Sequence, residues 1–462
     1  MGWLDKLFGR EEPSTAEEIA PATDTVASIP AAPLAILPGI RFGRYSDNNK
    51  SYDKIRSWYL AEDRFKEKAY AESFAAFFDH ISDGEEQNVV FRTDGNAFSF
   101  EFFQGSEKIL GQSDGKHIVA KASVALMEKP SNAVMHRLLT LNFSLRYTRF
   151  ALDDTHTLCQ LFDTPVSMAS PNKLYYGLRE LAKYADRLDD QLITDFASLK
   201  PTGTGHIQPL PEAELRVKYT YFRKWIEDTL GRVSGLNADS FAGAIAYLLL
   251  TLLYRIDFLI VPEAGLLSRL ETLSNVYWHK KDEIPLVERN ARMMEGIRKL
   301  LDITYEEFAK GAYRTKNTFA VVAAPPPDKV RENIQSANKD AQWYVENKYP
   351  DLVLIINEYG MVYNQFSYSM PALLTGLTII YMAVMHADFF RDLGMNELFY
   401  DPATGQLYQE RITRAIDEAI ARWPDKYPAL HWDHNKISYS NLPEFAFSFS
   451  EHLATLNLEI KK

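Results

Sequence analysis

The densest group of side chains that could do chemistry is His431-Trp432-Asp433-His434, which places two imidazoles and a carboxylate within four residues. Imidazole nitrogens and carboxylate oxygens are ligands that zinc and iron take in proteins. On an extended segment His431 and Asp433 point to one side and His434 to the other. His431 and Asp433 are therefore the candidate metal ligands, with a third ligand required from elsewhere. The alternative, which the short run favours, is that they are surface or packing residues.

A second group, His386, Asp388, Arg391 and Asp392, follows an apolar stretch. His386 and Asp388 could supply the missing ligand, but residues i and i+2 do not share a helix face. Asp388 and Asp392 do share one, and paired carboxylates can bind a cation or transfer protons. With Arg391 beside them, the spacing favours an ion pair on a helix surface.

The remaining candidates for chemistry are isolated. Residues 357–360 (Asn-Glu-Tyr-Gly) follow the strand-like run 352–356, where either an active site or a plain turn could lie. Cys159 falls among apolar residues of a predicted strand, where a thiol is unreactive. Residues 203–205 (Gly-Thr-Gly) lack the lysine of a phosphate-binding loop. The sequence therefore gives no catalytic motif and no cofactor, and it favours a protein that is not an enzyme.

Length and composition bound the class of protein. The 462 residues exceed one ordinary core and predict two or three domains. Hydrophobic residues make up 46% and charged residues 24%, as in soluble globular proteins. A net charge of −11 argues against a nucleic-acid binder, which needs a basic surface. One cysteine and the lack of a long apolar run in residues 1–10 favour a cytoplasmic location.

Residues 1–10 have the pattern of a short amphipathic peptide. Four apolar residues fall on one face at helical spacing: Trp3, Leu4, Leu7 and Phe8. Two turns do not form a stable helix alone, so such a peptide folds only when it docks. Residues 11–42 are rich in Pro, Ala, Thr and Glu, which predicts a disordered linker. We expect a docking helix on a flexible leash that binds a partner protein or a membrane surface, or else a start that docks nowhere or onto its own domain.

Residues 45–198 have the pattern of an α+β domain. Its expected elements are a helix at 58–81, strands at 88–92, 97–103 and 117–126, a helix opening at 130–132, a hairpin of 149–152 and 157–162, and a helix capped by Ser170. The order is α-β-β-β-α-β-β-α.

The phrase Leu141-Asn142-Phe143, followed by the hairpin from Arg149 to Asp153 and a long closing helix, carries a resemblance to a known family. Residues 60–197 resemble the YbjN family, whose domains share the fold of type III secretion chaperones. The resemblance implies a domain that binds protein, without catalytic residues. The related chaperones bind partner peptides on sheet edges and helix faces, often as dimers, so a homodimer is one expectation.

A linker at 199–212 leads into a mainly α-helical domain at 213–462. Its two most apolar stretches, 241–258 and 359–387, are expected to form the core of this domain rather than to span a membrane. The alternation of Phe445, Phe447 and Phe449 predicts a terminal strand.

The sequence thus predicts an α+β protein in which a chaperone-like domain precedes a mainly helical domain. The first hypothesis is a non-catalytic adaptor or chaperone that binds another protein, in a secretion, injection-system or regulatory pathway. The second is an enzyme or metal-binding protein with a site in the helical domain near His386, Asp388, His431 and Asp433. The third is attachment to a membrane surface through residues 1–10.

Overall fold

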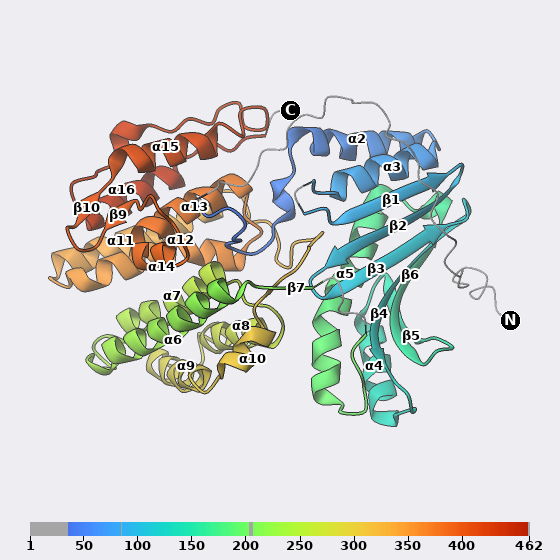
Figure 1. The fold of residues 1–462 in the computed structure, drawn as a ribbon, viewed down its shortest axis with the longest axis horizontal. Coiled ribbons are helices and arrows are strands. Elements are labelled where there is room, and N and C mark those ends of the chain that lie inside the picture. Colours follow the sequence, from blue (N-terminus) through green and yellow to red (C-terminus); the bar gives the residue numbers. More distant parts are fainter. Residues whose placement is uncertain (1–35, 85, 203–206, 461–462) are drawn as a thin grey trace. The chain divides into compact units, whose positions relative to one another are not determined.

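A computed structural model describes residues 36–84, 86–202 and 207–460. These residues form a six-stranded antiparallel sheet with helices, followed by a mainly helical region (Figure 1). We name residues 45–202 the sheet part and residues 207–460 the helical part. The expected α+β class, with a mainly helical second half, is confirmed. The peptide at residues 1–10, with Trp3, Leu4, Leu7 and Phe8, lies outside the described residues.

The sheet part contains one helix and one strand more than the sequence predicted. Its elements are η1 (Asp47–Asn49), α2 (Tyr52–Lys66), α3 (Tyr70–Ile81), β1 (Val89–Asp94), β2 (Ala97–Gln104), β3 (Glu107–Ser113), β4 (His117–Leu126), α4 (Asn132–Ser144), β5 (Thr148–Leu152), β6 (Thr157–Pro165), η2 (Val166–Met168) and α5 (Pro171–Asp195). The sheet has the order β1-β2-β3-β4-β6-β5, with every neighbouring pair antiparallel.

Two local features explain the differences. The expected helix at 58–81 is broken into α2 and α3 near Lys68, whose φ of 63° is left-handed and ends the first helix. The missed strand β3 has few apolar residues and contains Gly111. A side chain at Gly111 would overlap the ring of Phe100 on the neighbouring strand, so the close packing of β2 on β3 requires glycine there.

One face of the sheet is apolar and packs against the helices. Phe98, Phe100 and Phe102 alternate along β2 and are all buried in the core of the sheet part. The other face carries ion pairs, including Lys121 with Asp153 at 2.6 Å. This division is typical of an antiparallel sheet with one solvated face. Helix α5 begins as expected, with the Ser170 hydroxyl accepting from the amide of Lys173.

The described residues of the helical part form eleven α-helices, four two-residue strands and one short 3₁₀ helix. Its elements are β7 (Gln208–Pro209), α6 (Glu212–Ser234), α7 (Ala242–Ile260), α8 (Ala264–Trp278), α9 (Leu286–Leu300), α10 (Tyr305–Lys310), β8 (Tyr313–Arg314), α11 (Lys329–Glu346), α12 (Pro350–Ser367), α13 (Ala372–Met385), α14 (Ala387–Asp392), β9 (Tyr400–Asp401), β10 (Gln406–Leu407), α15 (Gln409–Ile420), η3 (His434–Lys436) and α16 (Leu442–Ala454).

Two predicted strands in this part are wrong. The run 352–356 lies inside α12, which Pro350 opens at its first turn. The tail with Phe445 and Phe449 belongs to α16, whose N-cap Asn441 accepts from the amide of Glu444 at 2.9 Å. Phe445 and Phe449 are four residues apart and both buried, so the alternation in sequence hid a helical spacing.

The two most apolar helices, α7 and α13, belong to one hydrophobic cluster, as expected. By length and composition α7 could cross a membrane, but 89% of its most apolar window is buried inside the protein. α13 has only 14 residues.

The end of the expected disordered linker is ordered. Leu37 and Phe42 are buried in the cluster of the helical part, and the Phe42 ring lies 5.1 Å from that of Phe390. The amide of Gly43 donates to the carbonyl of Phe258 at 2.7 Å. The prediction of disorder up to residue 42 is therefore wrong for residues 36–42.

Candidate protein-interaction surface

Helix α4 buries one apolar stripe and exposes another. Val134 and Leu138 point inward and join the core of the sheet part. On the opposite side lie Met135, Leu139 and Phe143, which are 36%, 66% and 95% exposed. Their spacing of four residues sets them in a row along the helix. Single exposed apolar residues are ordinary, but a row that ends in a fully exposed phenylalanine marks a surface suited to binding.

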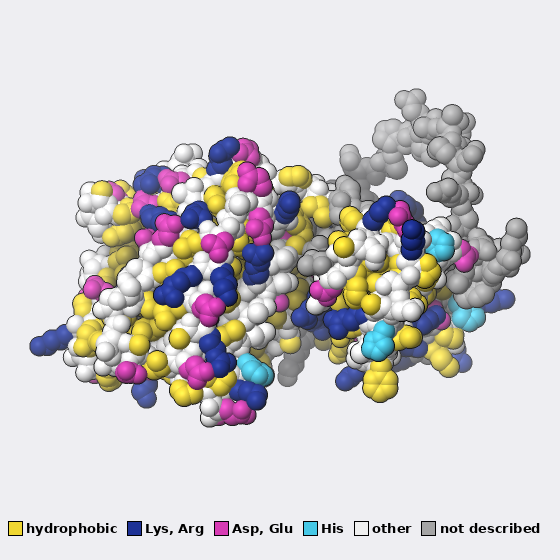
Figure 2. All heavy atoms as spheres, turned by 90° about the horizontal axis from the view of Figure 1, so that it is seen from below, with side chains coloured by type: hydrophobic (Ala, Val, Ile, Leu, Met, Phe, Trp, Pro, Cys, Tyr) yellow, Lys and Arg dark blue, Asp and Glu magenta, His cyan; other side chains and the backbone are white. Residues whose placement is uncertain are grey.

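The segment that carries this row is rich in basic residues. Residues 127–152 contain four Lys or Arg residues and a single acidic residue, Glu128, although Arg149 pairs with Asp163 and Glu180 accepts from the amide of Arg146. Figure 2, which views the molecule from below Figure 1, shows hydrophobic side chains lying among Lys, Arg and His on the side where α4 lies. A partner for this surface therefore needs apolar residues flanked by acidic ones.

Side chains occupy the outer backbone groups of β5, the edge strand beside α4. Asn142 donates to the carbonyl of Phe150 at 3.2 Å and accepts from its amide at 2.6 Å, so it occupies the outer backbone groups of β5. Glu180 accepts from the amides of Tyr147 and Thr148 at 2.7 and 2.9 Å. Filled groups of this kind block the pairing of another strand. A partner on this side is thus directed to the α4 row and away from the β5 edge.

At the opposite edge, β1 keeps its outer backbone groups unpaired by any strand of the described residues. The amide of Phe103 donates to the carbonyl of Asn88, which sets the alternation of paired groups along β1 and β2. Val89, Phe91 and Thr93 therefore direct their amides and carbonyls outward. This edge is the one at which the sheet could receive a strand.

The structure does not gather the predicted metal ligands into one site. His431 is exposed, and the Asp433 carboxylate accepts from the amide of Asn435 at 3.0 Å. The amide of Asp433 donates to Nε2 of His452 at 2.8 Å, while His434 pairs with Asp417. Among the described residues no group of three His, Cys, Asp or Glu side chains is placed to hold a metal ion. Within the part of the chain that the structure describes, His431 and Asp433 are therefore not joined by a third ligand.

His386 instead faces a buried ion pair that the sequence reasoning missed. Glu358 on α12 accepts two bonds from Arg255 on α7, at 2.6 and 2.9 Å. Nε2 of His386 lies 3.2 Å from the same carboxylate. Burial alone would raise the pKa of Glu358, but Arg255 and His386 outweigh it and lower that pKa to about 2. Asp388 lies apart from this group and pairs with Arg391 at 2.7 Å.

Sequence signals for this pair existed. Arg255 and Asp257 are charged residues within an apolar helix, and buried charges in proteins are paired. Asp257 is held by Arg44 at 2.8 Å. Glu358 stood in the motif at 357–360, which was assigned to the end of a strand and lies within α12. Both pairs satisfy charges inside the core, which is a structural arrangement.

Cys159 is buried on β6, next to Asp153. Burial raises the pKa of its thiol to about 12, which keeps the sulfur protonated and unreactive.

No protein-family model matches this sequence, and a search of curated proteins returns no match. The resemblance of residues 60–197 to the YbjN family therefore stays a prediction. The geometry gives Asn142 in the quoted phrase a role that does not depend on that resemblance, since its amide closes the edge of β5.

Proposed function

We propose that the protein is a non-catalytic adaptor or chaperone-like protein that binds a protein partner on the exposed face of α4. The observation that carries the proposal is the row of Met135, Leu139 and Phe143, which is apolar and exposed on a helix that buries Val134 and Leu138 in the core of the sheet part. Large apolar side chains in contact with water favour association, because burying them removes apolar area from solvent.

The partner that best fits is an amphipathic helix with acidic residues beside its apolar stripe. Residues at i, i+4 and i+8 form a straight row of the kind that packs along another helix. The basic residues around it, including Arg137 and Arg146, would attract acidic groups and speed association. The blunted β5 edge argues against added strands at this place.

The proposal includes the first ten residues, and for these it rests on the sequence alone. Trp3, Leu4, Leu7 and Phe8 have the pattern of a second, independent docking element for a protein partner or a membrane surface. A cytoplasmic setting and a role in a secretion or regulatory pathway are part of the same proposal, supported by the composition and by the resemblance.

The experiment is a capture from the native host with the full chain and with the double variant Leu139→Asp/Phe143→Asp, followed by reconstitution of the captured protein in pure form. Aspartate at both positions adds the wrong charge for an acidic partner and removes the apolar row. We expect one partner to be captured by the unaltered chain and lost with the double variant.

The matched control is Leu60→Asp on α2, where a leucine of similar type is 47% exposed in the same part of the molecule. A partner retained by the double variant would contradict the assignment to α4. Assembly of the pure chain into a dimer that the double variant abolishes would identify a second copy as the occupant. Binding to vesicles of anionic lipid that is lost in the double variant would replace the protein partner by a membrane surface.

A further inference from the structure

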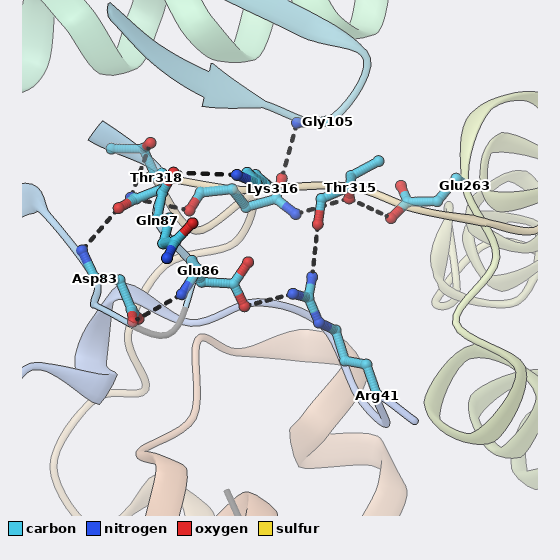
Figure 3. A network of polar contacts seen from close by, with 11 residues as sticks. Arg41, Asp83, Glu86, Gln87, Gly105, Glu263, Thr315, Lys316 and Thr318 are labelled. Atoms are coloured by element: carbon cyan, nitrogen blue, oxygen red, sulfur yellow. Dashed lines mark hydrogen bonds and ion pairs between the residues drawn. The ribbon is translucent and has the colours of Figure 1, made fainter. Parts of the chain in front are cut away.

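A segment of the helical part packs on the sheet part as an extended peptide would. Residues 315–322, which we name the strap, follow β8 and contain no helix and no regular strand, only one antiparallel bridge between Lys316 and Gly105. After the strap the chain contacts the helical part again, where the carbonyl of Ala323 accepts a hydrogen bond from the amide of Ser369 at 2.9 Å. Figure 3 shows the first residues of the strap between Gly105 in the β2–β3 turn and the side chains of Asp83, Glu86 and Gln87.

The sheet part binds the backbone of the strap along most of its length. Four carbonyls of the strap accept hydrogen bonds. The amide of Gly105 donates to Lys316 at 3.1 Å, and the side chain of Asn88 donates to Asn317 at 3.2 Å. The side chain of Arg179 donates to Ala320 at 3.0 Å, and that of Lys183 donates to Val321. In the other direction, Gln104 accepts from the amides of Thr318 and Phe319 at 3.3 and 3.0 Å. These groups come from β2, the β2–β3 turn, α5 and the residue before β1.

Three side chains of the strap are also recognised. Asn317 accepts from the Gln104 amide group and from the Gly105 amide, both at 3.0 Å. The Thr318 hydroxyl donates to the carbonyl of Phe103 at 2.8 Å. Phe319 is only 1% exposed and belongs to the core of the sheet part. Its ring lies 5.7 Å from that of Phe102 and 5.4 Å from that of Tyr175, in edge-to-face arrangements.

We propose that the sheet part contains a binding site for an extended peptide with an Asn-Thr-Phe core, which the strap fills as an intramolecular ligand and which a partner's segment of the same pattern can occupy in its place. Backbone bonds supply affinity in this mode of recognition, and the side-chain contacts supply specificity. The site is separate from the α4 row, so it would give the adaptor a second and sequence-selective contact.

The contacts at the first residue of the strap are few and polar. The Thr315 hydroxyl donates to Glu263 at 3.0 Å, and Arg41 donates to the Thr315 carbonyl at 2.9 Å (Figure 3). After the strap, residues 325–327 are three consecutive prolines, which cannot donate backbone bonds. The strap is thus a linear segment tied at both ends, and its high effective concentration would exclude a free peptide while it is in place.

The test uses the full chain with Phe319→Ala, which removes the buried ring from the strap and leaves the site intact. The probe is a fluorescent peptide with the sequence of residues 313–324, and its binding is measured by fluorescence anisotropy. We expect the peptide to bind the variant about tenfold or more tightly than it binds the unaltered chain, whose site is filled. The same peptide with alanine in place of its phenylalanine should bind neither protein measurably.

A second variant tests the proposal even if Phe319→Ala does not fold. A protease recognition sequence inserted between Ala324 and Pro325 frees one end of an unaltered strap after cleavage, so that the labelled peptide can exchange with it. Both proteins are first checked for native helix content by circular dichroism. Failure of the folded variant and of the cleaved chain to take up the peptide would overturn the proposal and make the strap a permanent structural element.

The two proposals are separated by combining variants. The Leu139→Asp/Phe143→Asp change should leave uptake of the strap peptide by Phe319→Ala unaltered, because α4 does not contact the strap in the described hydrogen bonds and ring contacts. A loss of uptake caused by the α4 change would contradict the independence of the two sites.

Discussion

The two regions of the molecule differ in one buried ion pair and one exposed apolar row. The helical part buries charges, since Arg255 and Glu358 lie inside its core and are only 8% and 3% exposed. The sheet part exposes apolar residues, with Leu139 and Phe143 in contact with solvent. Both charges of this buried pair have their partner within the helical part. The α4 row has no such partner among the described residues, which is why we place the binding function there.

The largest effect is expected where a buried charge loses its partner. Glu358→Gln removes the negative charge and leaves Arg255 buried beside a neutral amide, which should lower the free energy of unfolding by about 3–5 kcal/mol. Urea denaturation at neutral pH measures it. The control is Glu397→Gln, whose pair with Arg414 lies on the surface and should matter by less than about 1 kcal/mol. Equal effects of the two variants would remove the contrast between core and surface.

A second carboxylate, Glu263, is partly buried and accepts a hydrogen bond from the Thr315 hydroxyl instead of from a cation. Burial raises its pKa from 4.5 to about 7, although Thr315, Arg41 and Arg44 act to lower it and Asp257 to raise it. Because the folded state holds the proton more tightly, the free energy of unfolding should fall as the pH rises from about 4.5 to about 7 and stay level above that. Glutamine at position 263 does not titrate, so the stability of Glu263→Gln should not fall in this way. The advantage of the variant over the unaltered chain should therefore grow as the pH rises, by at most about 3 kcal/mol above pH 7.

Denaturation at pH 5 and at pH 8 checks this prediction. The exposed change Glu306→Gln serves as the control on the neighbouring helix α10. A difference between Glu263→Gln and the unaltered chain that is equal at both pH values would show that the carboxyl is not held in its neutral form.

The blunted edge offers a smaller effect within the sheet part. Asn142→Ala removes both bonds to Phe150 and should cost about 1–3 kcal/mol, because the backbone groups of an otherwise packed strand lose their partners. Asn172→Ala on α5, where the amide bonds Glu62 at an exposed site, should change stability by less than about 0.5 kcal/mol. Thermal unfolding compares the two, and light scattering tests whether the opened β5 edge promotes aggregation. An Asn142→Ala protein as stable as Asn172→Ala would contradict the role given to this side chain.

The smallest effect on stability is expected at the α4 row itself. Phe143→Asp changes a side chain that is 95% exposed, so the free energy of unfolding should move by no more than about 0.5 kcal/mol. Denaturation in urea measures this. A loss of several kcal/mol would mean that another part of the chain covers Phe143, and the comparison between the two regions would fail.

Much of the fold could be predicted because local signals agree with it. Ser170 and Pro171 open α5 as their types dictate, and the hairpin of β5 and β6 follows from alternation around a turn. The strands predicted at 352–356 and 445–449 were wrong because short apolar runs fit a buried helix as well as a strand.

The binding face could not be predicted because α4 is apolar on two sides. One stripe contains Val134 and Leu138, and the other contains Met135 and Leu139. Periodicity shows that a helix has apolar stripes but does not say which one meets the core. The strap was beyond sequence reasoning for a related reason. Its partners, such as Asn88 and Gln104, lie more than 200 residues away in the chain.

The most direct test of the central claim is a titration of the purified partner with the unaltered chain, with Leu139→Asp/Phe143→Asp and with Leu60→Asp, by isothermal calorimetry. We predict that the unaltered chain and Leu60→Asp bind with equal affinity, while the α4 double variant binds about a hundredfold more weakly or not at all, since two central apolar contacts are lost. Equal binding by all three proteins would contradict the assignment of the binding function to α4.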